Sequence, residues 1–97
     1  MLKNYDEKYL EKKLNSEIKR MGGMSIKLSS PFLVGLPDRL CLLPQGRLFF
    51  SEIKTPGKKP RRIQWFMIKK IRKLGFHVVV IDSMEILLET IQKYEKK

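Results

Sequence analysis

The sequence predicts a mixed α/β domain with the element order αβββαβα, in which helices flank a small mixed sheet. Apolar residues recur at helical spacing in three segments of the chain and form strand-like runs in four others. Glycines and prolines stand at most of the boundaries between these segments. A chain of 97 residues can bury one hydrophobic core, so we expect residues 1–97 to form a single domain.

The N-terminal part of the chain is expected to form a helix, a short strand and a loop. In residues 5–21 the apolar side chains recur every three or four positions among lysines and glutamates, and Gly22 and Gly23 supply a stop signal. Residues 24–28 are a candidate strand. Residues 29–37 contain two prolines and a glycine and are expected to be a loop.

The middle of the chain is predicted to form an antiparallel hairpin. Residues 38–43 and 47–54 are apolar-rich runs of strand length, joined by the turn-forming string Pro44-Gln45-Gly46. Residues 55–60 contain two prolines and a glycine, which would end the sheet at that point.

A second helix is expected after this break, and Gly75 would end it. Its buried stripe is predicted to consist of Ile63, Phe66, Met67, Ile71 and Leu74.

The last part of the chain predicts a strand and a helix. Residues 76–81 form a continuous apolar run, typical of a strand covered on both faces, and the preceding helix would allow parallel pairing through a right-handed crossover. Ser83 can cap the last helix. Its inner positions would be Ile86, Leu87, Thr90 and Ile91, followed by a frayed tail at residues 93–97.

Two short strings in the hairpin carry the chemistry. Asp38 and Glu52 are placed almost symmetrically about Gln45, so the two carboxylates can approach each other on adjacent strands. Strand alternation would place Glu52 and Lys54 on one face and turn Ile53 into the core. The two carboxylates and the Ile53 carbonyl oxygen are hard ligands suited to Mg²⁺. These residues predict metal-assisted phosphodiester hydrolysis, whereas the alternative for Glu52 and Lys54 is an exposed ion pair on the solvent face.

The role expected of Lys54 follows from its position beside the carboxylates. Its ammonium group could hold the attacking water or offset the charge that builds up in the transition state.

The charge of the chain favours a polyanionic partner. Lysine and arginine outnumber aspartate and glutamate by 21 to 10, which gives a formal net charge of +11. No acidic residue occurs between Glu52 and Asp82, whereas nine basic residues do. The strongest candidates for binding DNA phosphates are Lys58, Lys59, Arg61 and Arg62, and the alternative is a solvated basic face. Because no base-reading motif is present, recognition by backbone and shape is expected.

Other features limit the functional classes. The single cysteine, Cys41, excludes an internal disulfide and a cysteine-ligated zinc cluster, and it is expected to be a small buried strand residue. His77 lies on an apolar strand and is expected to be structural. No apolar run approaches the length of about 20 residues that spans a bilayer. We therefore expect a soluble cytoplasmic protein without a membrane partner.

The chain resembles the VRR-NUC (virus-type replication-repair nuclease) domain, a branch of the PD-(D/E)XK or restriction-endonuclease-like superfamily. The resemblance runs through nearly the whole chain in order. It rests on Glu7-Lys8 and Glu11, Gly22-Gly23, Lys27-Leu28, Gly35-Leu36-Pro37-Asp38-Arg39-Leu40, Glu52-Ile53-Lys54, Gln64 and Leu74-Gly75-Phe76.

The resemblance implies a restriction-endonuclease-like core and a specific activity. Stand-alone domains of this family, encoded by phages and bacteria, resemble homodimeric endonucleases that cut branched DNA such as Holliday junctions with Mg²⁺ or Mn²⁺. The expected place of action is the cytoplasm of a bacterial or phage-infected cell. The family pattern implies a site built from Glu7 or Glu11, together with Asp38, Glu52, Lys54 and Gln64.

Two of these assignments leave alternatives. Helical geometry places Glu7 within the apolar stripe that faces the sheet and Glu11 at its margin, so Glu7 is preferred as catalytic residue and metal ligand. The alternative is that Glu7 is an acid in a frayed first turn, favoured there by the helix dipole. Gln64 could orient a water or contact the phosphate, and otherwise it would be a polar residue on a solvated face.

Two rival functions and one candidate interface complete the predictions. The protein could be a non-catalytic nucleic-acid-binding protein, or a nuclease of the same fold that prefers flaps, ends or duplex DNA. A homodimer contact could be formed by the apolar loop Pro31-Phe32-Leu33-Val34 and by Trp65, although that loop could instead cover the core.

Overall fold

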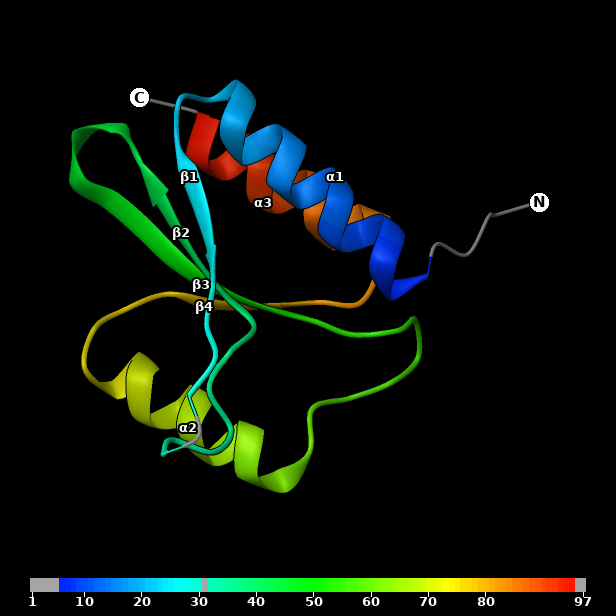
Figure 1. The fold of residues 1–97 in the computed structure, drawn as a ribbon. Helices are drawn as coiled ribbons and strands as arrows, with labels where there is room; N and C mark the ends of the chain where they lie inside the picture. Colours follow the sequence, from blue (N-terminus) through cyan, green and yellow to red (C-terminus); the bar gives the residue numbers. More distant parts are fainter. Residues whose placement is uncertain (1–5, 31, 96–97) are drawn as a thin grey trace.

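The fold is a four-stranded mixed sheet between two layers of helices. It was obtained as a computed structural model, and it describes residues 6–30 and 32–95. In chain order the elements are α1 (Glu7–Arg20), β1 (Met24–Lys27), β2 (Arg39–Leu43), a 3-10 turn η1 (Pro44–Gly46), β3 (Arg47–Ile53), α2 (Arg62–Lys73), β4 (Val78–Ile81) and α3 (Met84–Glu95). The predicted αβββαβα order is therefore confirmed (Figure 1).

The sheet has the order β1-β2-β3-β4, and its register positions the candidate site. The first three strands pair antiparallel, whereas β3 and β4 pair parallel, as the crossover through α2 predicted. Arg39 pairs with Ser51, so Asp38 and Glu52 lie beside each other one step further along the ladder. The predicted hairpin turn is a 3-10 turn in which Gln45 and Gly46 have positive φ.

The helices cover the two faces of the sheet unequally. The helices α1 and α3 lie side by side on one face, and α2 lies alone on the other (Figure 1). The main core lies between the sheet and the α1/α3 pair, where the cluster includes Leu14, Phe49, Ile53, Ile81 and Leu87. The prediction that Ile53 points into the core is confirmed. Among the described helices, none has the length and apolar character of a membrane span.

The predicted buried stripe of α2 is largely wrong. Ile63, Phe66 and Leu74 are 41%, 61% and 71% exposed, while the buried residues of the helix are Gln64 and Ile68. Gln64 and Ile68 are four residues apart, so they mark the line of the helix that faces the sheet. Spacing alone favoured the apolar residues because a buried glutamine is uncommon.

The C-terminal tail also differs from its prediction. The helix α3 continues through Tyr94 to Glu95, and Tyr94 is buried. Its ring stacks on Phe49 with centroids 4.5 Å apart, and its hydroxyl lies 2.7 Å from Nδ1 of His77. These contacts anchor the last turn, so the fraying predicted for residues 93–95 is wrong. Residues 5, 96 and 97 of the predicted helix and tail lie outside the described residues.

The remaining local predictions have mixed outcomes. Ser83 caps the last helix by accepting the Ile86 N–H at 3.2 Å, as predicted. Cys41 is fully buried, as predicted. The strand β4 begins at Val78, two residues after the start of the predicted apolar run, and Phe76 outside it is 45% exposed.

Candidate active site

The Asp38 carboxylate lies at the end of the sheet where the inner strand β2 begins and its neighbour β3 ends. Its Oδ2 accepts the backbone N–H of Ile53 at 2.9 Å, and its own carbonyl oxygen accepts the N–H of Leu28 at 2.8 Å. The preceding Pro37 is fully buried. Asp38 is therefore fixed from both the main chain and the side chain, while its Oδ1 has no hydrogen bond within the described part of the chain.

Glu52 is buried beneath the first turn of α2 and is only 1% exposed. Its Oε2 accepts a hydrogen bond from Nε2 of Gln64 at 2.8 Å and forms an ion pair with Nζ of Lys54 at 3.3 Å. The alternative of an exposed surface pair is thus wrong, although the prediction that Glu52 and Lys54 share a face is confirmed. Its Oε1 is buried and has no hydrogen-bond partner among the described residues.

Gln64 connects α2 to this carboxylate. Its Oε1 accepts the backbone N–H of Arg61 at 2.8 Å, and its amide nitrogen donates to Glu52. The side chain is 7% exposed, so the alternative of a solvated surface residue is wrong. Because both ends of the amide are engaged by the protein, Gln64 orients Glu52 in this structure.

Burial and mutual repulsion make the two carboxyl groups more basic. Burial raises the pKa of Glu52, the negative charge of Asp38 raises it further, and the Lys54 ammonium lowers it. The pKa of Asp38 is likewise raised by burial and by the charges of Glu7 and Glu11, against the opposing effects of the Ile53 N–H and Lys54. The backbone N–H of Asp38 also lowers the pKa of Glu52, although it makes no hydrogen bond to Oε1. Both carboxyl groups are therefore easier to protonate than free ones, chiefly because they are buried.

The two candidate helix carboxylates have different partners. Glu7 is exposed, and its Oε2 accepts a hydrogen bond from Oγ1 of Thr55 at 3.1 Å. Glu11 is half-buried, and its Oε2 lies 3.1 Å from Nε of Arg39. The reason given for preferring Glu7, its place in the stripe that faces the sheet, is wrong because Glu7 is exposed, and burial along α1 begins at Leu10. Glu7 remains a prediction as catalytic residue and metal ligand.

Two residues that the sequence patterns did not single out, Arg39 and Thr55, bind the two candidate helix carboxylates. Arg39 follows Asp38 along β2, so its side chain points to the opposite face, toward α1, where it binds Glu11 and lies 3.4 Å from Oγ of Ser25. The alternation of side chains along a strand was the signal that could have found this contact.

The donor set fits a hard divalent cation, though with few protein ligands. Within residues 6–30 and 32–95 no three His, Cys, Asp or Glu side chains lie close enough to form a metal-binding cluster. Asp38 and Glu52 remain as a carboxylate pair, next to the Ile53 carbonyl group. Mg²⁺ is commonly bound through one or two carboxylates and keeps several waters. The unpaired Glu52 Oε1 is a buried anionic oxygen that a cation would satisfy.

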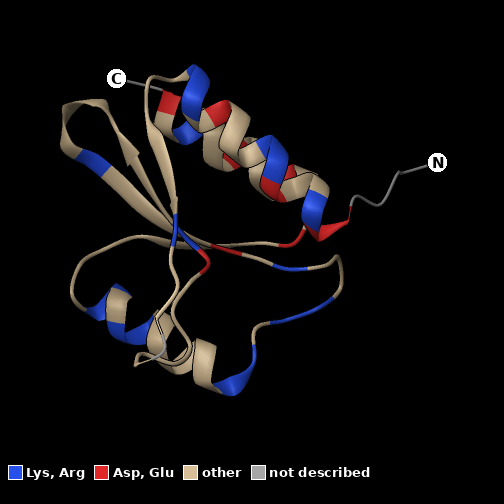
Figure 2. Cartoon of the chain, viewed as in Figure 1, with Lys and Arg blue, Asp and Glu red and all other residues tan. Residues whose placement is uncertain are grey.

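The basic residues predicted to contact DNA lie on the segment that follows the candidate site. Lys58, Lys59, Arg61 and Arg62 are all exposed, and the described residues offer none of them an ion pair. A turn closed by the Lys58 N–H on the Thr55 carbonyl group, at 2.9 Å, shapes this segment. Figure 2 shows blue segments along the loop after β3 and along α2, which has no acidic residue, whereas red and blue alternate along α1.

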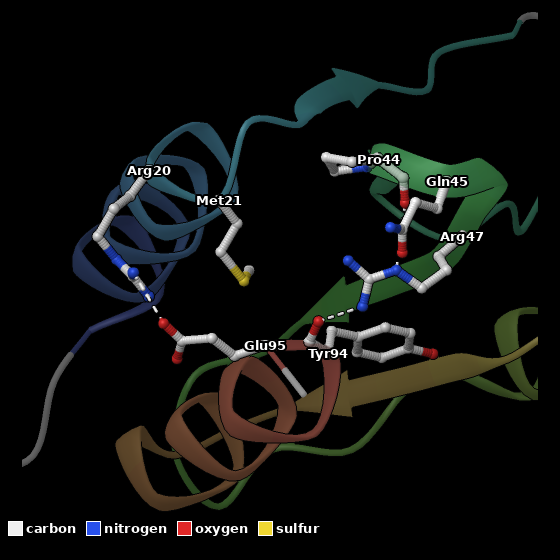
Figure 3. Close-up of a pocket in the computed structure, with 7 residues that line it drawn as sticks. All are labelled: Arg20, Met21, Pro44, Gln45, Arg47, Tyr94 and Glu95. Carbon is white, nitrogen blue, oxygen red and sulfur yellow. Dashed lines mark hydrogen bonds and ion pairs between the residues drawn. The ribbon is translucent and has the colours of Figure 1, made fainter. Parts of the chain in front are cut away.

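A cleft of about 340 Å³ lies apart from this site, between the C-terminal ends of α1 and α3 and the η1 turn. Figure 3 shows Arg20 paired with Glu95 at 2.8 Å and Arg47 bonded to the carbonyl oxygen of Tyr94. The arginines that line this cleft therefore bind groups of the protein itself. They tie the end of α3 to α1 and to the β2–β3 turn.

The mixed sheet is flanked by helices and has Asp38, Glu52 and Lys54 at one end of its inner strands. This arrangement is a restriction-endonuclease-like nuclease fold. A solved structure described as "VRR_NUC domain" has 31% sequence identity and a TM-score of 0.85, covering 91% of this chain and 96% of that chain. "Putative nuclease p44" of Acyrthosiphon pisum secondary endosymbiont phage 1 is 41% identical over 80 residues, which are 82% of this chain and 86% of that protein. No family model matches the sequence. The chain belongs to the VRR_NUC nuclease family.

Proposed function

We propose that this nuclease is a divalent-metal-dependent endonuclease that hydrolyses phosphodiester bonds in branched DNA, with Holliday junctions as its preferred substrate. The observation that carries the metal dependence is the buried, unpartnered Oε1 of Glu52 beside Asp38. An isolated buried carboxylate oxygen costs free energy unless a cation or a donor satisfies it. A non-catalytic DNA-binding protein would have no need for a buried acidic pair within a basic surface.

The ligands of Mg²⁺ or Mn²⁺ would be Asp38, Glu52 and the Ile53 carbonyl oxygen, with Glu7 as a further carboxylate. The bound ion would polarise a phosphoryl oxygen and lower the pKa of the attacking water. Lys54, 3.3 Å from Glu52, would hold the water or offset charge on the transition state. Attack of water on phosphorus breaks one P–O bond and leaves a hydroxyl and a phosphate end. Gln64 would keep Glu52 oriented during this step.

The basic segment would hold the DNA backbone next to these residues. Lys58, Lys59, Arg61 and Arg62 are exposed and lie between β3 and the first turn of α2. Phosphate contacts of this kind fix position without reading sequence, and they make binding fall steeply with salt. We expect action in the cytoplasm of a bacterial or phage-infected cell, where DNA junctions form.

The preference for four-way junctions would require two active sites. A homodimer with two-fold symmetry could place one site on each of two opposing strands, matching the symmetry of the junction. This part of the proposal rests on the family resemblance together with the small size of the domain.

A substrate panel tests the proposal. The protein is incubated with Mg²⁺, Mn²⁺ or EDTA and with four-way junctions, flaps, duplexes and single strands of matched sequence. We expect junction cleavage with either ion and none in EDTA, and Asp38→Ala should lose cleavage while retaining binding. Absence of cleavage on every substrate with both ions would overturn the nuclease mechanism proposed here. A preference for flaps would overturn only the assignment to Holliday junctions.

A further inference from the structure

The loop between β1 and β2 is anchored at its base next to the catalytic residue Asp38. Its base is closed by the hydrogen bond from the Leu28 N–H to the carbonyl oxygen of Asp38, at 2.8 Å. At the same end Pro37 is fully buried. The loop therefore leaves the sheet at the residue that carries the first catalytic carboxylate, and its position relative to the site is fixed.

A second anchor holds this loop against the start of α2. Gly35 has φ of +87°, and a Cβ atom there would lie 2.7 Å from the carbonyl oxygen of Ile63. Only glycine allows the two backbones to approach so closely in this conformation. Further along, Oγ of Ser30 accepts the N–H groups of Phe32 and Leu33 at 3.2 and 3.1 Å. Figure 1 shows the loop crossing α2.

The tip of the loop, defined as Phe32, Leu33 and Val34, exposes its side chains although its base is fixed. Phe32 is 90% exposed, Leu33 55% and Val34 64%. The alternative that this loop covers the core is therefore wrong for these three residues; Pro31 of the predicted apolar string lies outside the described residues.

The tip is not the only apolar surface in this region. On α2, Ile63, which Gly35 contacts, is 41% exposed, and Phe66, one turn later, is 61% exposed. An anchored loop that ends in exposed apolar side chains indicates an interaction surface.

The neighbouring charges indicate what this surface meets. Arg61 and Arg62 immediately precede Ile63, and Lys58 and Lys59 lie just before them. Two copies of this chain meeting through the tip would bring these basic groups together, on molecules that each carry a formal charge of +11. DNA supplies the opposite arrangement, since its phosphates attract the basic groups while its exposed base faces are apolar.

We infer that the tip is a wedge that stacks on base faces exposed at a DNA branch, while the four basic residues hold the adjoining phosphates. The inference rests on the proposed function and adds a physical basis for its preference for branched DNA. Fully paired duplex offers the tip no free base face unless base stacking is first disrupted, which costs free energy. Phe32 is then a specificity-determining residue, separate from the carboxylates that carry out hydrolysis.

The test measures binding without cleavage. Affinities of the full chain for a four-way junction with unpaired bases at its centre, and for a duplex of equal length, are measured by fluorescence anisotropy in EDTA. Removal of one base-stacking aromatic ring should weaken junction binding about tenfold in Phe32→Ala and leave duplex binding within about twofold. Phe32→Trp should restore the junction affinity. Leu88→Ala, which truncates an exposed apolar residue on α3, is the matched control and should change neither.

Three results would overturn the wedge: equal loss on both substrates, no loss on either, or a change of molecular mass in Phe32→Ala by light scattering, which would make the tip a contact between subunits. The test is independent of catalysis. If Phe32 controls junction affinity but Mg²⁺ and Mn²⁺ support no cleavage, the wedge stands and the proposed endonuclease function fails.

Discussion

The two faces of the sheet are built on different principles. On the face covered by α1 and α3, apolar side chains fill the core, with Leu10, Leu14 and Ile18 fully buried along α1. On the α2 face, the buried residues include Glu52 and Gln64, while Ile63 and Phe66 remain exposed. The first face accounts for stability, whereas the second holds a buried charge and exposed apolar groups that folding alone does not require. Substitutions on the two faces should therefore separate stability from activity.

The largest effect is expected at the buried carboxylate of the α2 face. Glu52→Gln keeps the size of the side chain but removes the charge that would bind the metal. We expect the rate of junction cleavage to fall about 10³-fold, corresponding to about 4 kcal/mol of lost transition-state stabilisation. Single-turnover cleavage in Mg²⁺ measures the loss, and circular dichroism checks that the variant is folded. Activity within tenfold of the unaltered protein would remove Glu52 from the mechanism.

The opposite face should respond in the opposite way. Leu14→Ala leaves a cavity in a fully buried position of α1, and such truncations cost about 2–5 kcal/mol. Urea unfolding should show this loss, whereas cleavage measured at a temperature where the variant is folded should stay within about twofold. A large fall in activity of the folded variant would mean that the α1/α3 face also contributes to the site.

An intermediate effect is expected where the loop crosses α2. Gly35→Ala places a side chain in the left-handed region, 2.7 Å from the Ile63 carbonyl oxygen, so the loop or the helix must shift. The strain should cost about 1–3 kcal/mol of stability. Gly57 provides the control, because it also has positive φ but a Cβ atom added there would meet no described heavy atom within 4 Å. Gly57→Ala should be less harmful, and equal destabilisation by the two would show that contact with Ile63 is unimportant.

A smaller, stabilising effect is expected at Asp38. Because its pKa is raised in the folded protein, the protonated form favours folding. This contribution is present below the ordinary carboxyl pKa and is lost as pH rises through the raised value. At neutral pH and without metal, Asp38→Asn should raise stability by about 0.5–1 kcal/mol, a gain limited by solvent screening, and shift Tm by about 2–8 °C.

The pH dependence of that gain tests its cause. The difference in Tm between Asp38→Asn and the unaltered protein should shrink as pH falls through the raised pKa of Asp38. A gain that is independent of pH would assign the effect to packing instead of charge.

The sequence predicted the elements and the meeting of Asp38 with Glu52, because both follow from local periodicity and from the symmetry of one hairpin. It did not predict which side chains of α2 are buried. Ile63, Phe66 and Leu74 are apolar at helical spacing, but Gln64 takes the inner position because Glu52 needs a donor there. That requirement arises only when a helix and a strand 12 residues apart in sequence are packed together. The exposure of Glu7 agrees with the alternative of an acid in the first turn of the helix, which helical periodicity could not separate from a buried carboxylate.

The smallest effects should decide between the two helix carboxylates. Glu11 already pairs with Arg39 at 3.1 Å, so it is neutralised by a cation on the α1 face, whereas the partner of Glu7 within the described residues is the neutral hydroxyl of Thr55. To bind a metal ion, a carboxylate oxygen must release its present partner, and releasing a neutral hydroxyl costs less than breaking an ion pair. We therefore expect Glu7→Gln to raise the Mg²⁺ concentration needed for half-maximal cleavage. Glu11→Gln should leave that concentration unchanged and lower stability by less than about 1 kcal/mol, the range of partly exposed ion pairs. Magnesium titrations of the two variants in parallel measure the difference. A shift confined to Glu11→Gln would reverse the assignment and mean that Arg39 competes with the metal ion for Glu11.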